Sequence, residues 1–164
     1  MTYPITLNVN GVPYPLNVEA HATLLRVVRE QVGLTGSKEG CDDSECGACM
    51  MLLDGEPVNS CSYLAVQADG TEVTTVEGLA PDGDLAPIQQ AFLAEGGVQC
   101  GFCTPGMLIS AAKVLRDNPG ASRDEIRIAL SGNLCRCTGY DGIVRAVIDV
   151  ASAASGGEAA KASE

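Results

Sequence analysis

The chain has 164 residues, 46% of them hydrophobic, which is enough for one core or two small ones. Its formal charge of −11 and its lack of tryptophan argue against nucleic acid as a partner, because phosphates are bound by clustered Lys and Arg and bases by aromatic side chains. The N-terminus has no basic or apolar leader and no run approaches a membrane span, so we expect a soluble, cytoplasmic protein.

The first residues have the alternating pattern of a β-hairpin. Residues 5–18 predict two strands joined by a type I′ turn at Asn10-Gly11, and two prolines in the second strand predict that it lies at a sheet edge. Residues 23–32 then change to helical spacing, and Gly33 follows where a helix would end. We therefore expect a sheet with one packed helix.

Three further strand segments follow the first cysteines. Residues 50–54 predict a strand that ends in a turn at Asp54-Gly55. Residues 58–66 and 72–76 are separated by Ala68-Asp69-Gly70, which predicts a second hairpin.

The rest of the chain is predicted to be helical. Residues 78–87 are rich in Gly, Pro and Asp, which indicates a linker. The expected helices, of which the second has Thr104 as its N-cap and the third opens with a capping box at Ser122, cover residues 88–94, 105–116, 122–130 and 140–153. The expected organisation is a domain over 1–78, a linker over 79–87, a helical domain over 88–153 and a flexible tail over 154–164.

All eight cysteines of the chain fall into two groups of four. The first group has the spacing C-x4-C-x2-C plus one more cysteine, and its members are Cys41, Cys46, Cys49 and Cys61. This spacing is typical of a plant-type 2Fe-2S cluster. Zinc and disulfides are the alternatives, since zinc also takes CxxC pairs, whereas a reducing cytoplasm disfavours disulfides.

The second group consists of a CxxC pair and a CxC pair, namely Cys100, Cys103, Cys135 and Cys137. A thioredoxin-type dithiol would need a βαβ context, which this helical half lacks. Two of the predicted helices begin just after Cys103 and Cys137, and helix N-termini stabilise negative charge. The arrangement therefore suits an anionic cluster held by four thiolates.

No motif of the chain predicts a substrate site or a catalytic residue. There is no P-loop, no dinucleotide-binding glycine motif and only one histidine, which excludes a Rieske centre. We interpret His21 as a surface or capping residue. Five charged residues near the first group are interpreted as solvated loop residues, namely Lys38, Glu39, Asp42, Asp43 and Glu45.

Taken together, the two cysteine groups and the residues around them resemble the small iron-sulphur subunit of the bacterial molybdenum hydroxylases, the xanthine oxidase family. The resemblance covers residues 3–153 and depends on four segments, 40–42, 46–49, 99–106 and 132–140. The chain departs from the common family pattern at Ser44, where many members have Gly, and at Met50-Met51, where Thr-Val is frequent.

The resemblance implies an α+β protein in which an N-terminal β-grasp, ferredoxin-like 2Fe-2S domain is followed by a C-terminal four-helix-bundle 2Fe-2S domain. Each group of four cysteines would hold one cluster. Gln99 and Cys137 would approach the molybdopterin of a large subunit. Electrons would pass from there through the helical-domain cluster and then the ferredoxin-type cluster to FAD on a medium subunit, within a dimer of heterotrimers.

Two other functions stay open at this point. A free-standing carrier with two clusters would use the same cysteines without permanent partners. A zinc-stabilised interaction module would use them without redox chemistry. The substrate of the whole enzyme is not predicted, because the residues that would select it lie in another chain.

Overall fold

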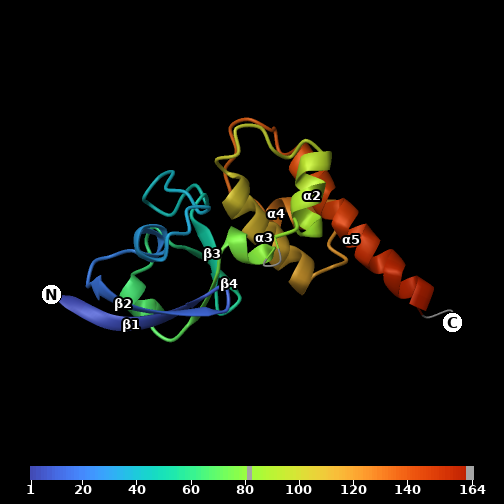
Figure 1. Cartoon of the computed structure of the whole chain (residues 1–164). Helices are drawn as coiled ribbons and strands as arrows, with labels where there is room; N and C mark the ends of the chain where they lie inside the picture. The colour runs from blue at the N-terminus through green and yellow to red at the C-terminus, as the bar shows by residue number, and fades with distance from the viewer. Residues whose placement is uncertain (81–82, 162–164) are drawn as a thin grey trace.

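The computed structural model describes residues 1–80 and 83–161, and it has a sheet in the first half of the chain and helices in the second (Figure 1). The sheet has five strands in the order β2-β1-β5-β3-β4. The strands are β1 (Thr2–Val9), β2 (Val12–Glu19), β3 (Met50–Leu53), β4 (Glu56–Asn59) and β5 (Glu72–Thr74).

The predicted N-terminal hairpin is confirmed. β1 and β2 pair antiparallel and meet at Val9 and Val12, across a turn in which Asn10 and Gly11 have φ values of 53° and 77°. These positive values are those of a type I′ turn, whose twist matches that of the strands. β2 lies at the edge of the sheet, as its prolines predicted.

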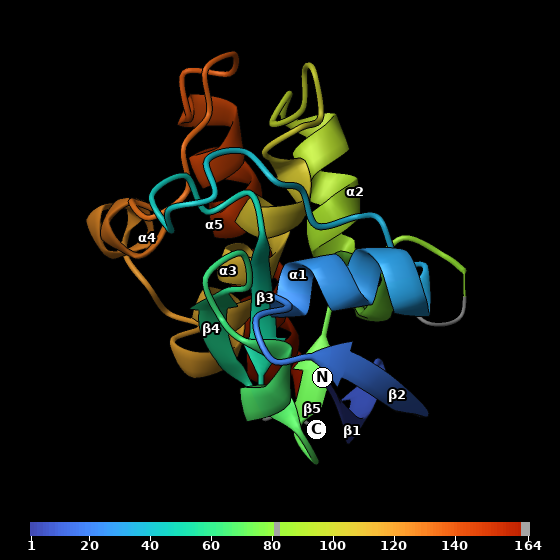
Figure 2. The ribbon, with the colours of Figure 1, turned by 90° about the vertical axis from the view of Figure 1, so that its left-hand side faces the viewer.

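The predicted helix is also present, although its second half is wound more widely. Thr23 caps α1 (Leu24–Val27) by accepting a hydrogen bond from the Arg26 N–H, and the chain continues as π-type turns over Val28–Val32. Gly33 ends the helix with a φ of 86°. α1 crosses the sheet in Figure 2, and its buried leucines share a core with the inward residues of β1, so that the helix covers one face of the sheet.

The predicted hairpin over 58–66 and 72–76 is wrong. β4 pairs with β3 through the turn at Asp54-Gly55, whereas residues 65–68 form a short 3-10 helix. β5 instead lies between β1, to which it is parallel, and β3, to which it is antiparallel. Ala65 and Ala68 explain the error, because both are fully buried and their three-residue spacing is helical.

The second half consists of helices as predicted, with shifted boundaries. These helices are α2 (Pro87–Ala94), α3 (Thr104–Asp117), α4 (Arg123–Ala129) and α5 (Asp141–Lys161). Ser122 caps α4 in the expected capping box, but the N-cap of α3 is Cys103, because Thr104 is already helical. α5 continues to Lys161 instead of ending at residue 153. Pro81 and Asp82 of the expected linker lie outside the described residues.

The two halves touch along α3 and β3. Met50 and Leu52 of β3 are buried against Ile109 of α3, and this small cluster is separate from the core of the sheet and from that of the helices. Figure 1 shows α3 beside β3 at the junction. No helix within the described ranges is both long and apolar enough to span a membrane.

Candidate functional site

The first four cysteines lie together at one end of the sheet. Cys41 and Cys46 belong to the irregular loop that connects the first helix to β3, Cys49 directly precedes β3, and Cys61 follows β4. The pairing of β3 with β4 therefore brings Cys49 and Cys61 side by side, and their thiols interact. The loop brings Cys41 and Cys46 together, with the Cys46 N–H donating to the Cys41 sulfur at 3.4 Å.

Glycine makes the close packing of this loop possible. A Cβ added to Gly40 would lie 2.9 Å from the Cys46 sulfur, so any larger residue would displace this thiol. Gly47 has a φ of 70° and is buried, and the Lys38 N–H donates to the Ala48 carbonyl at 3.0 Å. Backbone N–H groups that approach sulfur atoms are a feature of iron-sulphur loops, because they stabilise the negative charge of the cluster.

The thiols of the first group differ in their proton affinity. Burial, and then the neighbouring Cys61, raises the pKa of Cys49 to about 11. The Asp43 carboxylate raises the pKa of Cys41, but backbone N–H groups of Asp43 and Cys46 outweigh it, so that this pKa lies below its ordinary value. The loop is thus already arranged to stabilise a thiolate at its exposed end.

The second four cysteines lie in two loops at one end of the helices. The Cys100 and Cys137 sulfurs are 3.6 Å apart, and Cys103 interacts with Cys135. Cys103 occupies the N-cap position of α3, so its thiol is at a helix N-terminus, where partial positive charge stabilises a thiolate ligand. Burial nevertheless raises the pKa of the free Cys103 thiol to about 12, followed in effect by the neighbouring Cys135.

Thr138 and Tyr140 shape the loop that contains the CxC pair. The Thr138 hydroxyl lies 3.1 Å from the Cys135 sulfur, and the Thr138 N–H donates to the same sulfur at 3.5 Å. The Tyr140 hydroxyl oxygen accepts the Cys135 N–H at 2.8 Å, and the Tyr140 N–H donates back to the Thr138 hydroxyl. Burial alone would raise the pKa of Cys135, but the hydrogen bonds from Thr138 lower it to about 7.

Replacing Thr138 with valine is expected to lower the reduction potential of the centre in the helical half. The hydroxyl donates to a sulfur that becomes more negative on reduction, so its loss destabilises the reduced state. One hydrogen bond of about 1 kcal/mol corresponds to roughly 40 mV for one electron. A redox titration followed by electron paramagnetic resonance (EPR) would measure the change. Thr71→Val is the control, because the Thr71 hydroxyl donates to the Ala68 carbonyl, in the other half of the chain from Cys135. An equal change of potential in both variants would contradict the prediction.

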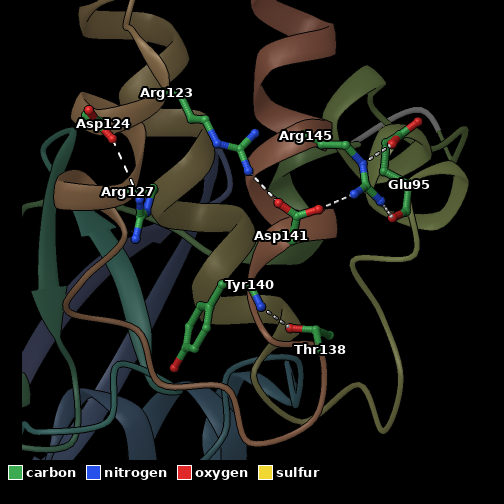
Figure 3. A network of polar contacts seen from close by, with 8 residues as sticks. All are labelled: Glu95, Arg123, Asp124, Arg127, Thr138, Tyr140, Asp141 and Arg145. Carbon is green, nitrogen blue, oxygen red and sulfur yellow. Dashed lines mark hydrogen bonds and ion pairs between the residues drawn. The ribbon is translucent and has the colours of Figure 1, made fainter.

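A polar network fixes the helices on which the second loop depends. Figure 3 shows Asp141, the first residue of α5, between Arg123 of α4 and Arg145 of α5, with which it forms ion pairs. Arg145 also binds Glu95 at the end of α2, both at its carboxylate, at 2.8 Å, and at its carbonyl, at 3.1 Å. Exposed pairs are weak singly, but this network joins three helices next to Tyr140, which closes the cysteine loop.

The arrangement of the thiols fits a binuclear centre better than a single ion. Each group of four divides into two pairs, which are Cys41 with Cys46, Cys49 with Cys61, Cys100 with Cys137, and Cys103 with Cys135. A 2Fe-2S cluster takes two thiolates on each iron, whereas zinc needs its ligands around one point.

A buried hydroxyl next to the second group supports the same fit. Thr104 directly follows Cys103, and its hydroxyl oxygen is buried and has no hydrogen-bond partner among the residues that the structure describes. Buried polar atoms in native proteins nearly always have partners, so an orphan beside a thiol suggests an acceptor that the chain itself does not provide. The sulfur atoms of a cluster are such acceptors.

The other residues that the sequence singled out lie as follows. Gln99 is exposed next to Cys100, which is itself exposed, as is Cys137. His21 is at the surface, 3.4 Å from Glu19. Asp42, Asp43 and Glu45 are exposed loop residues.

Sequence reasoning missed Ser110, Asn133 and Thr138. Asn133 and Thr138 belong to a segment that carried the resemblance, but their side chains had no assigned role. Ser110 sits among apolar residues of α3, and only its burial within the folded chain reveals a function. A polar residue inside an apolar helical stripe is the one signal that could have indicated it.

Two family profiles together cover most of the chain. The profile described as 2Fe-2S iron-sulfur cluster binding domain matches residues 7–80, and the one described as [2Fe-2S] binding domain matches residues 75–148. The first match contains the first cysteine group and the second match contains the second. The chain therefore has two 2Fe-2S binding domains.

Two characterised relatives match over nearly their whole length. The nicotinate dehydrogenase small FeS subunit of Eubacterium barkeri is 50% identical over 87% of this chain and 91% of that protein. The xanthine dehydrogenase iron-sulfur-binding subunit of Escherichia coli O157:H7 is 46% identical over 90% of this chain and 94% of that protein. Both names describe iron-sulphur subunits of dehydrogenases.

Solved structures agree in fold. A chain of quinoline 2-oxidoreductase from Pseudomonas putida 86 superposes with a TM-score of 0.91 at 48% identity, over 96% of this chain and 98% of that one. Aldehyde oxidoreductase from Desulfovibrio gigas superposes with a TM-score of 0.88 at 43% identity, and the match covers 94% of this chain but 17% of that longer chain. The same arrangement thus occurs both as a separate chain and as part of a larger one.

Proposed function

Since the chain belongs to the small iron-sulphur subunits of the xanthine-oxidase family of molybdenum hydroxylases, we propose that it is the electron-transfer subunit of such an enzyme. The observation that carries this proposal is that the chain has two 2Fe-2S binding domains and matches iron-sulphur subunits of dehydrogenases over nearly their full length. The chain has no substrate site of its own in this proposal, and the chemistry of hydroxylation belongs to a partner.

The proposed organisation has one centre in each half. A β-grasp, ferredoxin-like domain over 1–78 holds the first cluster through Cys41, Cys46, Cys49 and Cys61. A four-helix domain over 88–153 holds the second through Cys100, Cys103, Cys135 and Cys137. The pairing of the thiols supports these ligand sets, because each pair would bind one iron. The clusters supply one-electron transfer when bound.

We further propose that the two ends of the relay face different partners. The exposed Gln99 and Cys137 would lie against a large subunit at its molybdopterin, so electrons would enter there. The other end would pass electrons to FAD on a medium subunit, and a dimer of heterotrimers is the assembly we expect. All eight cysteines are proposed cluster ligands and none is left for a disulfide, which suits a reducing compartment and supports a cytoplasmic location.

Expression of the chain together with its genomic neighbours would test the proposed function. The expected product is a brown complex that contains molybdenum and, per copy of this chain, four iron and four sulfide, with two distinct 2Fe-2S signals on reduction. A brown chain that runs alone on a sizing column would favour the free-standing carrier instead. A colourless chain that contains zinc would overturn the assignment altogether.

A further inference from the structure

The two halves also meet where the backbones of Gly47 and Gly106 touch, a contact that we call the seam. A Cβ added to Gly106 of α3 would lie 2.0 Å from the Gly47 carbonyl oxygen, and one added to Gly47 would lie 2.3 Å from the carbonyl oxygen of Gly132. The neighbouring atoms are backbone atoms, which cannot swing aside as a flexible side chain can. The cysteine loop of the first half therefore rests directly on the helical half.

The buried side chain of Asn133 holds this contact together through hydrogen bonds. Its side chain is 2% exposed, its Nδ2 donates to the Gly47 carbonyl at 3.0 Å, and its Oδ1 accepts the Ser110 hydroxyl at 2.6 Å. The amide orientation follows from chemistry, because a carbonyl oxygen can only accept. One buried side chain thus joins the cysteine loop, α3 and the loop before Cys135, and both ends of its amide are satisfied.

Gly47 and Asn133 both lie close in sequence to proposed ligands, one from each centre. Gly47 follows Cys46, and Asn133 lies two residues before Cys135. Between them, the Leu134 N–H donates to the Cys46 carbonyl at 2.9 Å, so the two ligand loops are hydrogen-bonded to each other. A movement of one loop would therefore change the distance between the two centres.

We infer that Asn133 is a positioning residue that fixes the spacing of the two 2Fe-2S centres and thereby the rate of electron passage between them. This inference rests on the proposed function. In the step concerned, one electron leaves the centre of the helical half, which is oxidised, and enters the first centre, which is reduced; no bond or proton changes. The rate of electron transfer between two centres falls steeply as the distance between them increases. A rigid seam that keeps this distance short therefore keeps the transfer fast.

The test uses Asn133→Asp in the assembled complex. This change keeps the shape of the side chain and its acceptor for Ser110, but puts a carboxylate oxygen against the Gly47 carbonyl, which removes the donor and repels the loop. Both clusters should still load, each with its own EPR g values. The splitting of the signals caused by magnetic interaction between the two reduced clusters should fall, and rapid-mixing reduction of the first cluster by the second should slow by about tenfold.

Two further variants keep the inference falsifiable. Gly106→Ala should separate the same loops by steric means, with the same loss of splitting, and it replaces the first variant as the readout if Asn133→Asp does not assemble. Gly120→Ala is its matched control, because an added Cβ there meets nothing within 4 Å, and Asn17→Asp is the exposed control for the amide change.

The outcomes separate the inference from the proposed function. Loaded seam variants with the splitting and transfer rate of the controls would overturn the role of Asn133 and leave the electron-transfer function intact. A wild-type complex without 2Fe-2S signals would overturn the proposed function itself.

Discussion

Cys46→Ser and Cys137→Ser are each expected to disable a different centre and to stop electrons at different points. Serine replaces a soft thiolate with a harder and less acidic oxygen ligand, so the affected cluster is lost or altered. The loss should exceed the roughly 10–100-fold effect on metal affinity that follows removal of an outer hydrogen-bond partner. Because the two residues belong to different groups, the cluster of the other half should remain.

The two variants should be told apart by the order of reduction after substrate is mixed with the complex. With Cys137→Ser, electrons should leave the molybdenum centre slowly, and the first cluster and the flavin should stay oxidised. With Cys46→Ser, the helical-half cluster should be reduced at its normal rate, and the flavin should stay oxidised. Ser62→Ala serves as the control. The Ser62 hydroxyl lies next to the Cys61 sulfur, so its removal changes the polarity near a sulfur without removing a ligand. Loss of both clusters in either variant would contradict separate sites.

The sequence was most informative where chemistry fixes spacing. Eight cysteines in two groups of four predicted two centres, and two 2Fe-2S binding domains match the chain. The turn at Asn10-Gly11 and the capping box at Ser122 require particular local backbones, so these two features could be predicted residue by residue. Each depends on neighbours within a few positions along the chain.

The features that escaped prediction depend on contacts between distant segments. β5 inserts between β1 and β3, a choice made by the whole sheet, and its short length gives a weak pattern. The seam joins Gly47 to Gly106 and Asn133, which lie far from it in sequence. A single small or polar residue has no periodic pattern from which such a contact could be predicted.

Removal of the clusters is expected to destabilise the whole chain. The loop that holds Cys41 and Cys46 and the loop that holds Cys135 and Cys137 contain no regular helix or strand, so the proposed ligation would be the main cross-link within each. Structural zinc contributes roughly 10–16 kcal/mol in small folds, which is comparable with the roughly 5–15 kcal/mol stability of a typical domain. We therefore expect the melting temperature of the cluster-free chain to fall by more than about 10 °C, measured by circular dichroism. An unchanged melting temperature would contradict a structural role of the clusters.

Reloading of the cluster-free chain should become more favourable as pH rises from 7 to 9. Burial raises the pKa of Cys49 to about 11 and that of Cys103 to about 12, so both thiols are protonated throughout this range and each must release a proton on binding iron. Each proton released increases the loading equilibrium by about tenfold per pH unit. Cys135, whose pKa is lowered to about 7 by Thr138 against the effect of burial, has mostly lost its proton by pH 8 and adds little above it. Competition for iron with a chelator of known protonation constants would measure the slope, and loading that is independent of pH would show that these two thiols are not ligands.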